Sequence, residues 1–143
     1  MKNHIIPKTI KMIPLGGNLT YTNSLMIIEF DNFNIYNCYL QAGSKHSIGQ
    51  EKLYIHYSRC RLQLLEYIMT RLDKITPSIL LGDFNINLND TIDNYPELRG
   101  INKLINEYNF IDTWTINKND GYTENTDINI MRWNDKMKDK KSR

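Results

Sequence analysis

The order of sequence patterns predicts an α/β (α+β) domain in which a β-hairpin is followed by a helix and a further strand. Residues 19–30 and 35–40 are rich in apolar and aromatic residues, and 31–34 between them supply a tight turn, which is typical of a hairpin. Apolar residues then recur at helical spacing over 49–73, with Arg59, Arg61 and Glu66 largely off the apolar stripe, and a short apolar run follows at 79–81. Strand, helix and strand in this order predict a βαβ-like unit with the helix packed on a sheet.

The segments around this unit complete the prediction. Residues 5–15 alternate loosely and contain two prolines, which favours an edge strand or an irregular beginning. Pro96 is placed to open a second amphipathic helix, and 110–114 indicate a short strand or edge segment. No internal repeat or linker is visible, so we expect residues 1–143 to form a single domain.

Composition indicates a globular, soluble chain with a core of its own. The chain has 143 residues, of which 41% are hydrophobic and 24% charged. A formal net charge of +2 is too small to argue for nucleic acid or an anionic membrane as a partner. Valine is absent and Ala42 is the one alanine, whereas isoleucine and asparagine are abundant, which is the bias expected of an AT-rich genome.

Cysteine usage and the N-terminus favour an intracellular protein. Cys38 and Cys60 lie in apolar segments, and we expect two free buried thiols. The first residues contain no apolar region of signal-peptide length. No run approaches the roughly 18 apolar residues of a membrane span, so no transmembrane segment is expected.

Two polar residues directly follow the apolar run at 79–81. Because side chains alternate along a strand, extended geometry through Asn85 would put Asp83 and Asn85 on one face and Phe84 on the other. A carboxylate and an amide would then emerge at the C-terminal end of a central strand buried on both faces, where open α/β sheets usually bind ligands. The alternative is a strand that simply ends in an Asx-type turn.

A second pair of polar side chains lies on the preceding strand. Asn37 and Tyr39 share one face of the strand predicted over 35–40. An asparagine inside a mostly apolar strand needs a hydrogen-bond partner. Either Asn37 bonds to a neighbouring loop, or Asn37 and Tyr39 line the same site as Asp83.

These segments belong to a longer series of short motifs along the chain. The series comprises Asn37-Cys38-Tyr39-Leu40, Arg61-Leu62, Gly82-Asp83-Phe84-Asn85, Asp112-Thr113-Trp114, and Gly121-Tyr122-Thr123 with Asn129 downstream. It resembles the endonuclease/exonuclease/phosphatase superfamily, whose members have the DNase I-like fold. Those members show an N-x-H-L strand, an R/Q-L helix, a G-D-x-N strand end, a D-x-W/Y segment and a G-x-T…N stretch. The resemblance covers residues 15–143, and Gly-Asp-Phe-Asn is its sharpest element.

The resemblance implies a metal-dependent phosphoester hydrolase with Mg²⁺ or Mn²⁺ as cofactor, or a fragment of one. Asp83 would orient or deprotonate the attacking water and act as a weak metal ligand, and Asn85 would contact the phosphate. Tyr39 stands where many members have histidine and exonuclease III-like nucleases often have tyrosine, and its hydroxyl would donate to a phosphate oxygen. Asn37 and Asn129 would bind the substrate beside them.

The implied fold is a four-layer α/β sandwich, in which two mixed β-sheets are flanked by helices, and this chain resembles a fragment of it. The family's early Asn and its metal-binding Glu find no match, and neither do its later R-x-D-Y and S-D-H segments, which supply a metal-linked Asp and a catalytic Asp–His pair. We therefore expect an incomplete domain with an exposed apolar sheet face, poorly stable unless a second polypeptide completes it.

Two functional hypotheses follow from this comparison. The chain is either a phosphoester hydrolase, or a catalytically inactive truncated remnant that serves as a binding or interaction module. The substrate class stays open among nucleic acid, nucleotide, inositol phosphate and sphingolipid, because members differ in the loops around the site.

Overall fold

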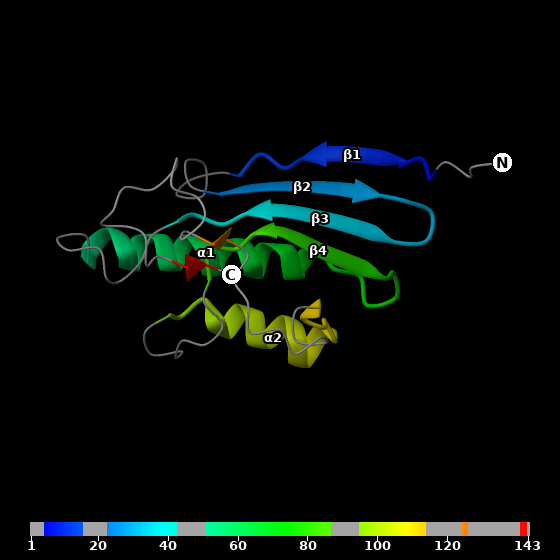
Figure 1. The fold of residues 1–143 in the computed structure, drawn as a ribbon. Coiled ribbons are helices and arrows are strands. Elements are labelled where there is room, and N and C mark those ends of the chain that lie inside the picture. Colours follow the sequence, from blue (N-terminus) through cyan, green and yellow to red (C-terminus); the bar gives the residue numbers. More distant parts are fainter. Residues whose placement is uncertain are drawn as a thin grey trace.

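The chain forms a four-stranded mixed β-sheet with two helices on one side of it (Figure 1). The computed structural model describes residues 5–15, 23–42, 51–86 and 95–113, together with the backbone of 124–125 and 141–142. The sheet and its helices comprise β1 (Thr9–Met12), β2 (Ser24–Glu29), β3 (Asn34–Tyr39), α1 (Glu51–Arg71), β4 (Ser78–Asp83) and α2 (Leu98–Tyr108). Two further strands, β5 (Glu124–Asn125) and β6 (Lys141–Ser142), pair with each other in a separate antiparallel ladder.

The strands follow one another across the sheet in the order β1-β2-β3-β4. The first three are antiparallel to their neighbours, and β3 and β4 are parallel. A backbone hydrogen bond from Phe30 N–H to the Phe33 carbonyl, at 3.0 Å, closes the turn between β2 and β3. The predicted hairpin and the predicted strand–helix–strand unit are therefore both confirmed, and the architecture is mixed α/β.

The core lies between the sheet and α1, because every second residue of β2 and β3 points toward the helix. Leu25, Tyr36 and Leu64 are buried there. The Tyr36 hydroxyl donates to the backbone carbonyl of Arg71 at 2.9 Å, which satisfies the polar tip of a buried ring. The same cluster includes Ile27, Cys38, Leu40, Leu65, Ile68, Met69 and Leu104.

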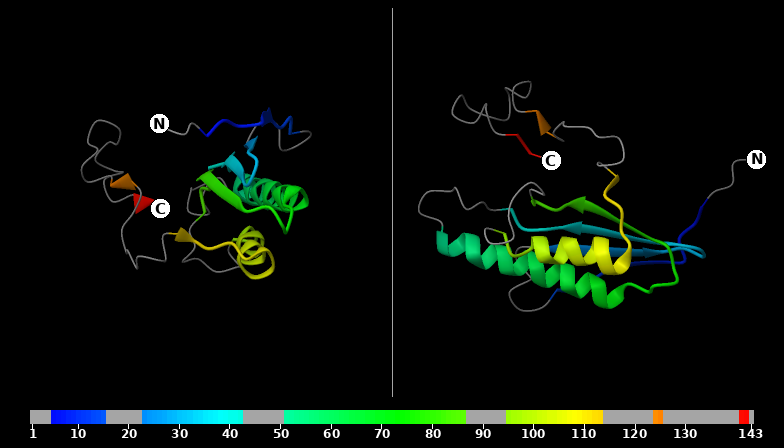
Figure 2. Two further views of the ribbon diagram at one scale, coloured as in Figure 1. Left: turned by 90° about the vertical axis from the view of Figure 1, so that its right-hand side faces the viewer. Right: turned by 90° about the horizontal axis from the view of Figure 1, so that it is seen from below.

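Helix α1 lies close to its predicted bounds, but one of its residues was placed wrongly by the periodicity. The pattern puts Arg61 off the apolar stripe, whereas the structure buries it completely, at 0% exposed. The reason is that α2 packs along a second side of α1 (Figure 2). Gly100 of α2 lies there against the side chains of Leu62 and Leu65. Arg61 lies on that second side, and its guanidinium pairs there with Glu97, with an Nη2–Oε1 distance of 2.5 Å.

Helix α2 begins two residues after Pro96, the residue expected to open it, and is followed by a residue in the left-handed conformation. Asn109 has φ 58° and its backbone N–H bonds to the Leu104 carbonyl, which also accepts the Phe110 N–H at 3.1 Å. This C-cap redirects the chain, so the strand predicted over 110–114 does not form at 110–113; Trp114 lies outside the described residues. Neither α1 nor α2 is long and apolar enough to cross a membrane.

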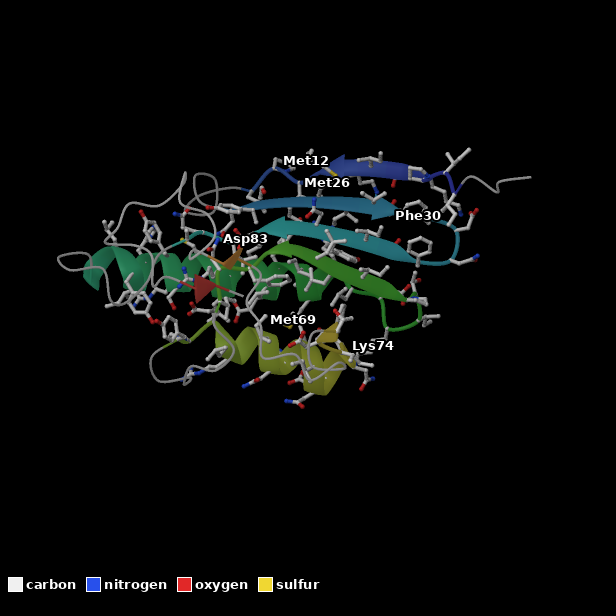
Figure 3. The ribbon with its side chains drawn as sticks, viewed as in Figure 1. Met12, Met26, Phe30, Met69, Lys74 and Asp83 are labelled. Carbon is white, nitrogen blue, oxygen red and sulfur yellow. The ribbon has the colours of Figure 1, made fainter. Side chains whose placement is uncertain are left out.

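The face of the sheet that points away from the helices is open in the described part of the chain. We call this surface the open face and define it by two cross-strand rows of residues. The rows are Ile10, Ile28, Ile35 and Ile79, and Met12, Met26, Asn37 and Leu81. Ile10 and Met12 are each 61% exposed, and Figure 3 shows Met12 and Met26 on neighbouring strands. The expected exposed apolar sheet face is thus present.

The prediction that the strand before Asp83 is buried on both faces is wrong. Among the described strands β4 is an edge strand, since it pairs with β3 alone. Its apolar run divides between two environments: Leu80 is half-buried on the helix side, whereas Ile79 and Leu81, on the open face, are 50% and 40% exposed. The physical reason is that the helices cover only one face of the sheet.

Gly82 allows β4 to approach β3 closely just before the polar turn. Its φ is +129°, and a Cβ at this position would lie 1.8 Å from the Cys38 carbonyl oxygen. L-residues rarely adopt this backbone conformation, and no side chain fits the space. Glycine is therefore required one residue before Asp83.

We predict that Gly82→Ala lowers the free energy of unfolding by about 3 kcal/mol or more, because it adds backbone strain to a clash with main-chain atoms. Urea unfolding followed by circular dichroism measures the change. Gly100→Ala is the comparison, since its Cβ would meet the side chains of Leu65 and Leu62 and no main-chain atom, so a smaller loss is expected. Equal stability of Gly82→Ala and wild type would contradict this account of the turn.

Candidate functional site

The candidate site lies where the parallel strands β3 and β4 end side by side. Tyr39 and Asp83 are register partners at this end, and the Leu40 N–H donates to the Asp83 carbonyl at 2.8 Å. Tyr39 is 40% exposed and Asp83 is exposed. Figure 3 labels Asp83 at the end of β4. Two of the predicted residues therefore meet at the carboxyl edge of a parallel pair, where α/β proteins commonly bind ligands.

A tight turn joins Asp83 to Asn85. The Asn85 backbone N–H donates to Asp83 Oδ1 at 3.1 Å, and Asn85 has φ 50°. Asparagine tolerates this left-handed conformation better than most residues. The Asn85 side-chain nitrogen donates to the Leu40 carbonyl at 2.8 Å, so the turn is held against the end of β3.

This turn corrects the predicted geometry of the two residues. The strand does not stay extended through Asn85, so Asp83 and Asn85 are not two residues of one strand face. The competing prediction of an Asx-type turn is confirmed by the Asn85–Asp83 bond. The amide nitrogen of Asn85 carries two hydrogens, so the bond to Leu40 leaves one of them for a ligand.

The two predicted substrate-binding residues stand differently. Asn37 lies on the open face, one cross-strand row behind Tyr39 and opposite Leu81. It is exposed, so water can satisfy its amide and no neighbouring loop is required. Asn129 lies outside the described residues.

The described residues supply little for a divalent metal ion. Within them, no cluster of three or more histidine, cysteine or acidic side chains has the geometry of a metal site. Asp83 offers one exposed carboxylate at the strand end. Mg²⁺ keeps several waters and is often held by one or two carboxylates together with substrate phosphates, so Asp83 fits the part of a single protein ligand.

The negative charge of Asp83 affects the pKa of the Cys38 thiol, which lies on the helix side of β3. Burial, and secondarily the negative charge of Asp83, raise the pKa of Cys38 to about 12. The thiol is therefore neutral at physiological pH and unsuited to act as a nucleophile. Both cysteines are free and buried, as predicted.

An apolar groove of about 1080 Å³ runs along the free edge of β4 and reaches Asp83. Helix α2 and residues 109–113 form its other wall. Leu81, Phe84 and Ile105 contribute apolar lining, and Asp83 lies among the lining residues. The carboxylate is thus approachable from this groove.

Sequence reasoning missed the residues that support the site from behind. Asn23, Arg61 and Glu97 are buried polar side chains, and Asn23 and Arg61 bond to the backbone of Gln41 beside the site. A partial signal for Arg61 existed, because it stands three and four residues before Leu64 and Leu65, which puts it at the edge of the apolar stripe rather than far from it. No local pattern marks Asn23 or Glu97, because their partners are distant in the sequence.

Comparison with protein-family models finds no match to this chain, and comparison with curated proteins finds no significantly similar sequence.

We predict that stability falls as pH rises from about 9 to about 12, and falls less steeply in Cys38→Ala. The folded state raises the pKa of Cys38 from 9.0 to about 12, so it holds a proton that the unfolded chain loses near pH 9. The stabilisation is complete below pH 9 and is lost on the way to pH 12.

Urea midpoints measured across this pH range test the prediction. Burial also raises the pKa of Tyr36, which adds a fall of the same sign in both proteins. The difference between the two curves therefore isolates the thiol. Parallel curves for wild type and Cys38→Ala would contradict the raised pKa.

Proposed function

We propose that this chain is a phosphoester hydrolase of the endonuclease/exonuclease/phosphatase type, or a fragment of one. One observation carries the proposal: the Gly-Asp-Phe-Asn motif ends a strand parallel to the one that bears Tyr39, so that Tyr39, Asp83 and the Asn85 turn are neighbours. A base and two donors at one edge are the groups that phosphoester hydrolysis needs.

The proposed chemistry uses each of these residues. The Asp83 carboxylate accepts a proton from the attacking water and orients it in line with the leaving group. The remaining Asn85 amide hydrogen and the Tyr39 hydroxyl donate to phosphate oxygens, which carry the developing negative charge. Asn37 stands one row behind as a further polar contact. A bound Mg²⁺ or Mn²⁺ would neutralise phosphate charge, with Asp83 as its protein ligand.

We further propose that the sheet is one of the two sheets of a DNase I-like sandwich. The described helices cover one face, and the open face carries mostly apolar residues, as in sheets that pack on a second sheet. The partner sheet would come from residues outside the described ones or from another polypeptide. Tyr39 lies at the rim of the open face, so the same partner would lie beside the candidate site.

The competing proposal is a catalytically inactive remnant or a binding module of the same fold. It is favoured by the single carboxylate that the described residues present at the strand ends. Such a chain would keep the turn and the sheet but would lack the metal affinity of an enzyme.

We predict that Asp83→Ala lowers hydrolysis of a generic phosphodiester by about two orders of magnitude or more, because it removes the proposed base. Bis(p-nitrophenyl) phosphate with Mg²⁺ or Mn²⁺ provides the assay, run on the chain together with any partner it requires. Asp31→Asn is the matched control, since Asp31 is an exposed carboxylate on the hairpin that pairs with Lys8.

Two results would count against this proposal. Undiminished activity in Asp83→Ala would remove Asp83 from the mechanism. Absence of activity, together with Mg²⁺ and Mn²⁺ binding by isothermal titration that is absent or only millimolar, would favour the inactive remnant.

We predict that the chain alone is poorly stable and self-associates, because the open face exposes apolar surface to water. Co-expression with the product of a neighbouring reading frame that supplies the missing motifs should yield a soluble complex. Light scattering and thermal melting measure both states. A monomeric 143-residue chain that melts cooperatively would contradict the need for a partner.

A further inference from the structure

The peptide group between Leu40 and Gln41 is held at both of its polar atoms. Its carbonyl oxygen accepts the Asn85 side-chain N–H at 2.8 Å, and its N–H donates to Asn23 Oδ1 at 2.8 Å. The two flanking groups are bound as well: the Leu40 N–H donates to the Asp83 carbonyl and the Gln41 carbonyl accepts from Arg61 Nη1, at 2.8 and 2.7 Å. Four successive backbone groups thus have four different partners.

These partners come from three separate parts of the fold. Asp83 ends β4 and Asn85 belongs to the turn after it, Asn23 precedes β2, and Arg61 lies in the middle of α1. Asn23 is itself anchored, because its amide nitrogen donates to the Cys60 carbonyl of α1 at 3.2 Å. The orientation of the Leu40 carbonyl, and with it the position of Asn85, is therefore set from outside the β3–β4 pair.

Arg61 is the most constrained of these partners. Its Nε donates to Glu97 Oε1 at 2.7 Å and its Nη2 lies 2.5 Å from the same oxygen, while Nη1 serves the Gln41 carbonyl. The Ser58 hydroxyl donates to the other oxygen of Glu97. Arg61 and Glu97 are both 0% exposed. The planar guanidinium bonds to Glu97 through two of its nitrogens and to the Gln41 carbonyl through the third. It therefore fixes this carbonyl relative to α1 and the beginning of α2.

We propose that Arg61 is a positioning residue for the candidate site. It acts through Glu97 on one side and the Gln41 carbonyl on the other, and holds the Leu40–Gln41 peptide so that Asn85 keeps one hydrogen directed at a phosphate. This inference rests on the proposed function, because only a phosphoester hydrolase would use the Asn85 hydrogen for a phosphate. The effect of Arg61 on the position of Asn85 can be tested without any substrate.

The test compares variants that remove the connection with one that only destabilises the core. Arg61→Met combined with Glu97→Met removes the guanidinium without leaving one buried charge unpaired, which keeps the chain able to fold. Arg61→Lys keeps the charge but lacks the fork that reaches two acceptors. Leu64→Ala, one turn further along α1, is the control, because it opens a cavity and leaves all four bonds intact.

The readout is the side-chain NH₂ signal pair of Asn85 in ¹H–¹⁵N NMR spectra of the full chain, with its partner if one is required. We expect both Arg61 variants to shift this pair and to speed its exchange with water by about tenfold or more, because the acceptor carbonyl is released. Leu64→Ala should lower the melting temperature and leave the Asn85 pair unchanged. In the assay for phosphodiester hydrolysis, the Arg61 variants should lose kcat while KM stays near that of wild type.

The outcomes separate the two proposals. An Asn85 pair that stays at its wild-type position and exchange rate in both Arg61 variants, with a lowered melting temperature, would overturn the positioning role and leave Arg61 a merely structural residue. An Asn85 pair that shifts in the Arg61 variants would support the connection. If the wild-type protein then shows neither phosphodiester activity nor metal binding, the proposed hydrolase is rejected.

Discussion

The parallel pairing of β3 with β4 is the interaction on which the rest of the structure depends. It puts Tyr39 level with Asp83 and lets the Asn85 turn bond to the end of β3. Parallel strands need a covering crossover, and α1 supplies it by burying Leu64 and its neighbours against the sheet. The close approach at Gly82 completes the pairing, because a side chain there would overlap the backbone of β3. Local turn chemistry and long-range packing thus converge on one edge of the sheet.

Periodicity predicted the parts of this fold that depend on one element and its own burial pattern. The hairpin, α1 and the strand–helix–strand order follow from apolar spacing and turn residues, and the structure confirms them. The wrong predictions concern which further element, if any, packs on a given face. Arg61 is buried because α2 packs on α1, and Ile79 is exposed because helices cover one face only. The local pattern records apolarity and not which partner covers a face, so it does not show that a charged side chain at Arg61 pairs with Glu97 or that Ile79 has no helix over it.

The candidate site was predictable in its members and not in its shape. Asp83, Asn85 and Tyr39 stand out as polar residues at strand ends, and the parallel register brings them together. The left-handed backbone of Asn85 makes the pair an Asx turn rather than one extended face. The supporting bonds from Asn23 and Arg61 come from distant segments, so only the folded chain reveals them. Together with the bonds of Asn85, these bonds hold the turn at the rim of the open face.

The central claim is that the ends of β3 and β4 recognise a phosphate. Titration of the isotope-labelled chain, with its partner if one is required, with Mg²⁺ and a non-hydrolysable phosphodiester tests it most directly by NMR. The account predicts saturable shifts at the backbone and side-chain signals of Tyr39, Asp83 and Asn85, with the opposite end of β4 at Ser78 unchanged. Shifts that avoid these residues, or none at millimolar ligand, would contradict it.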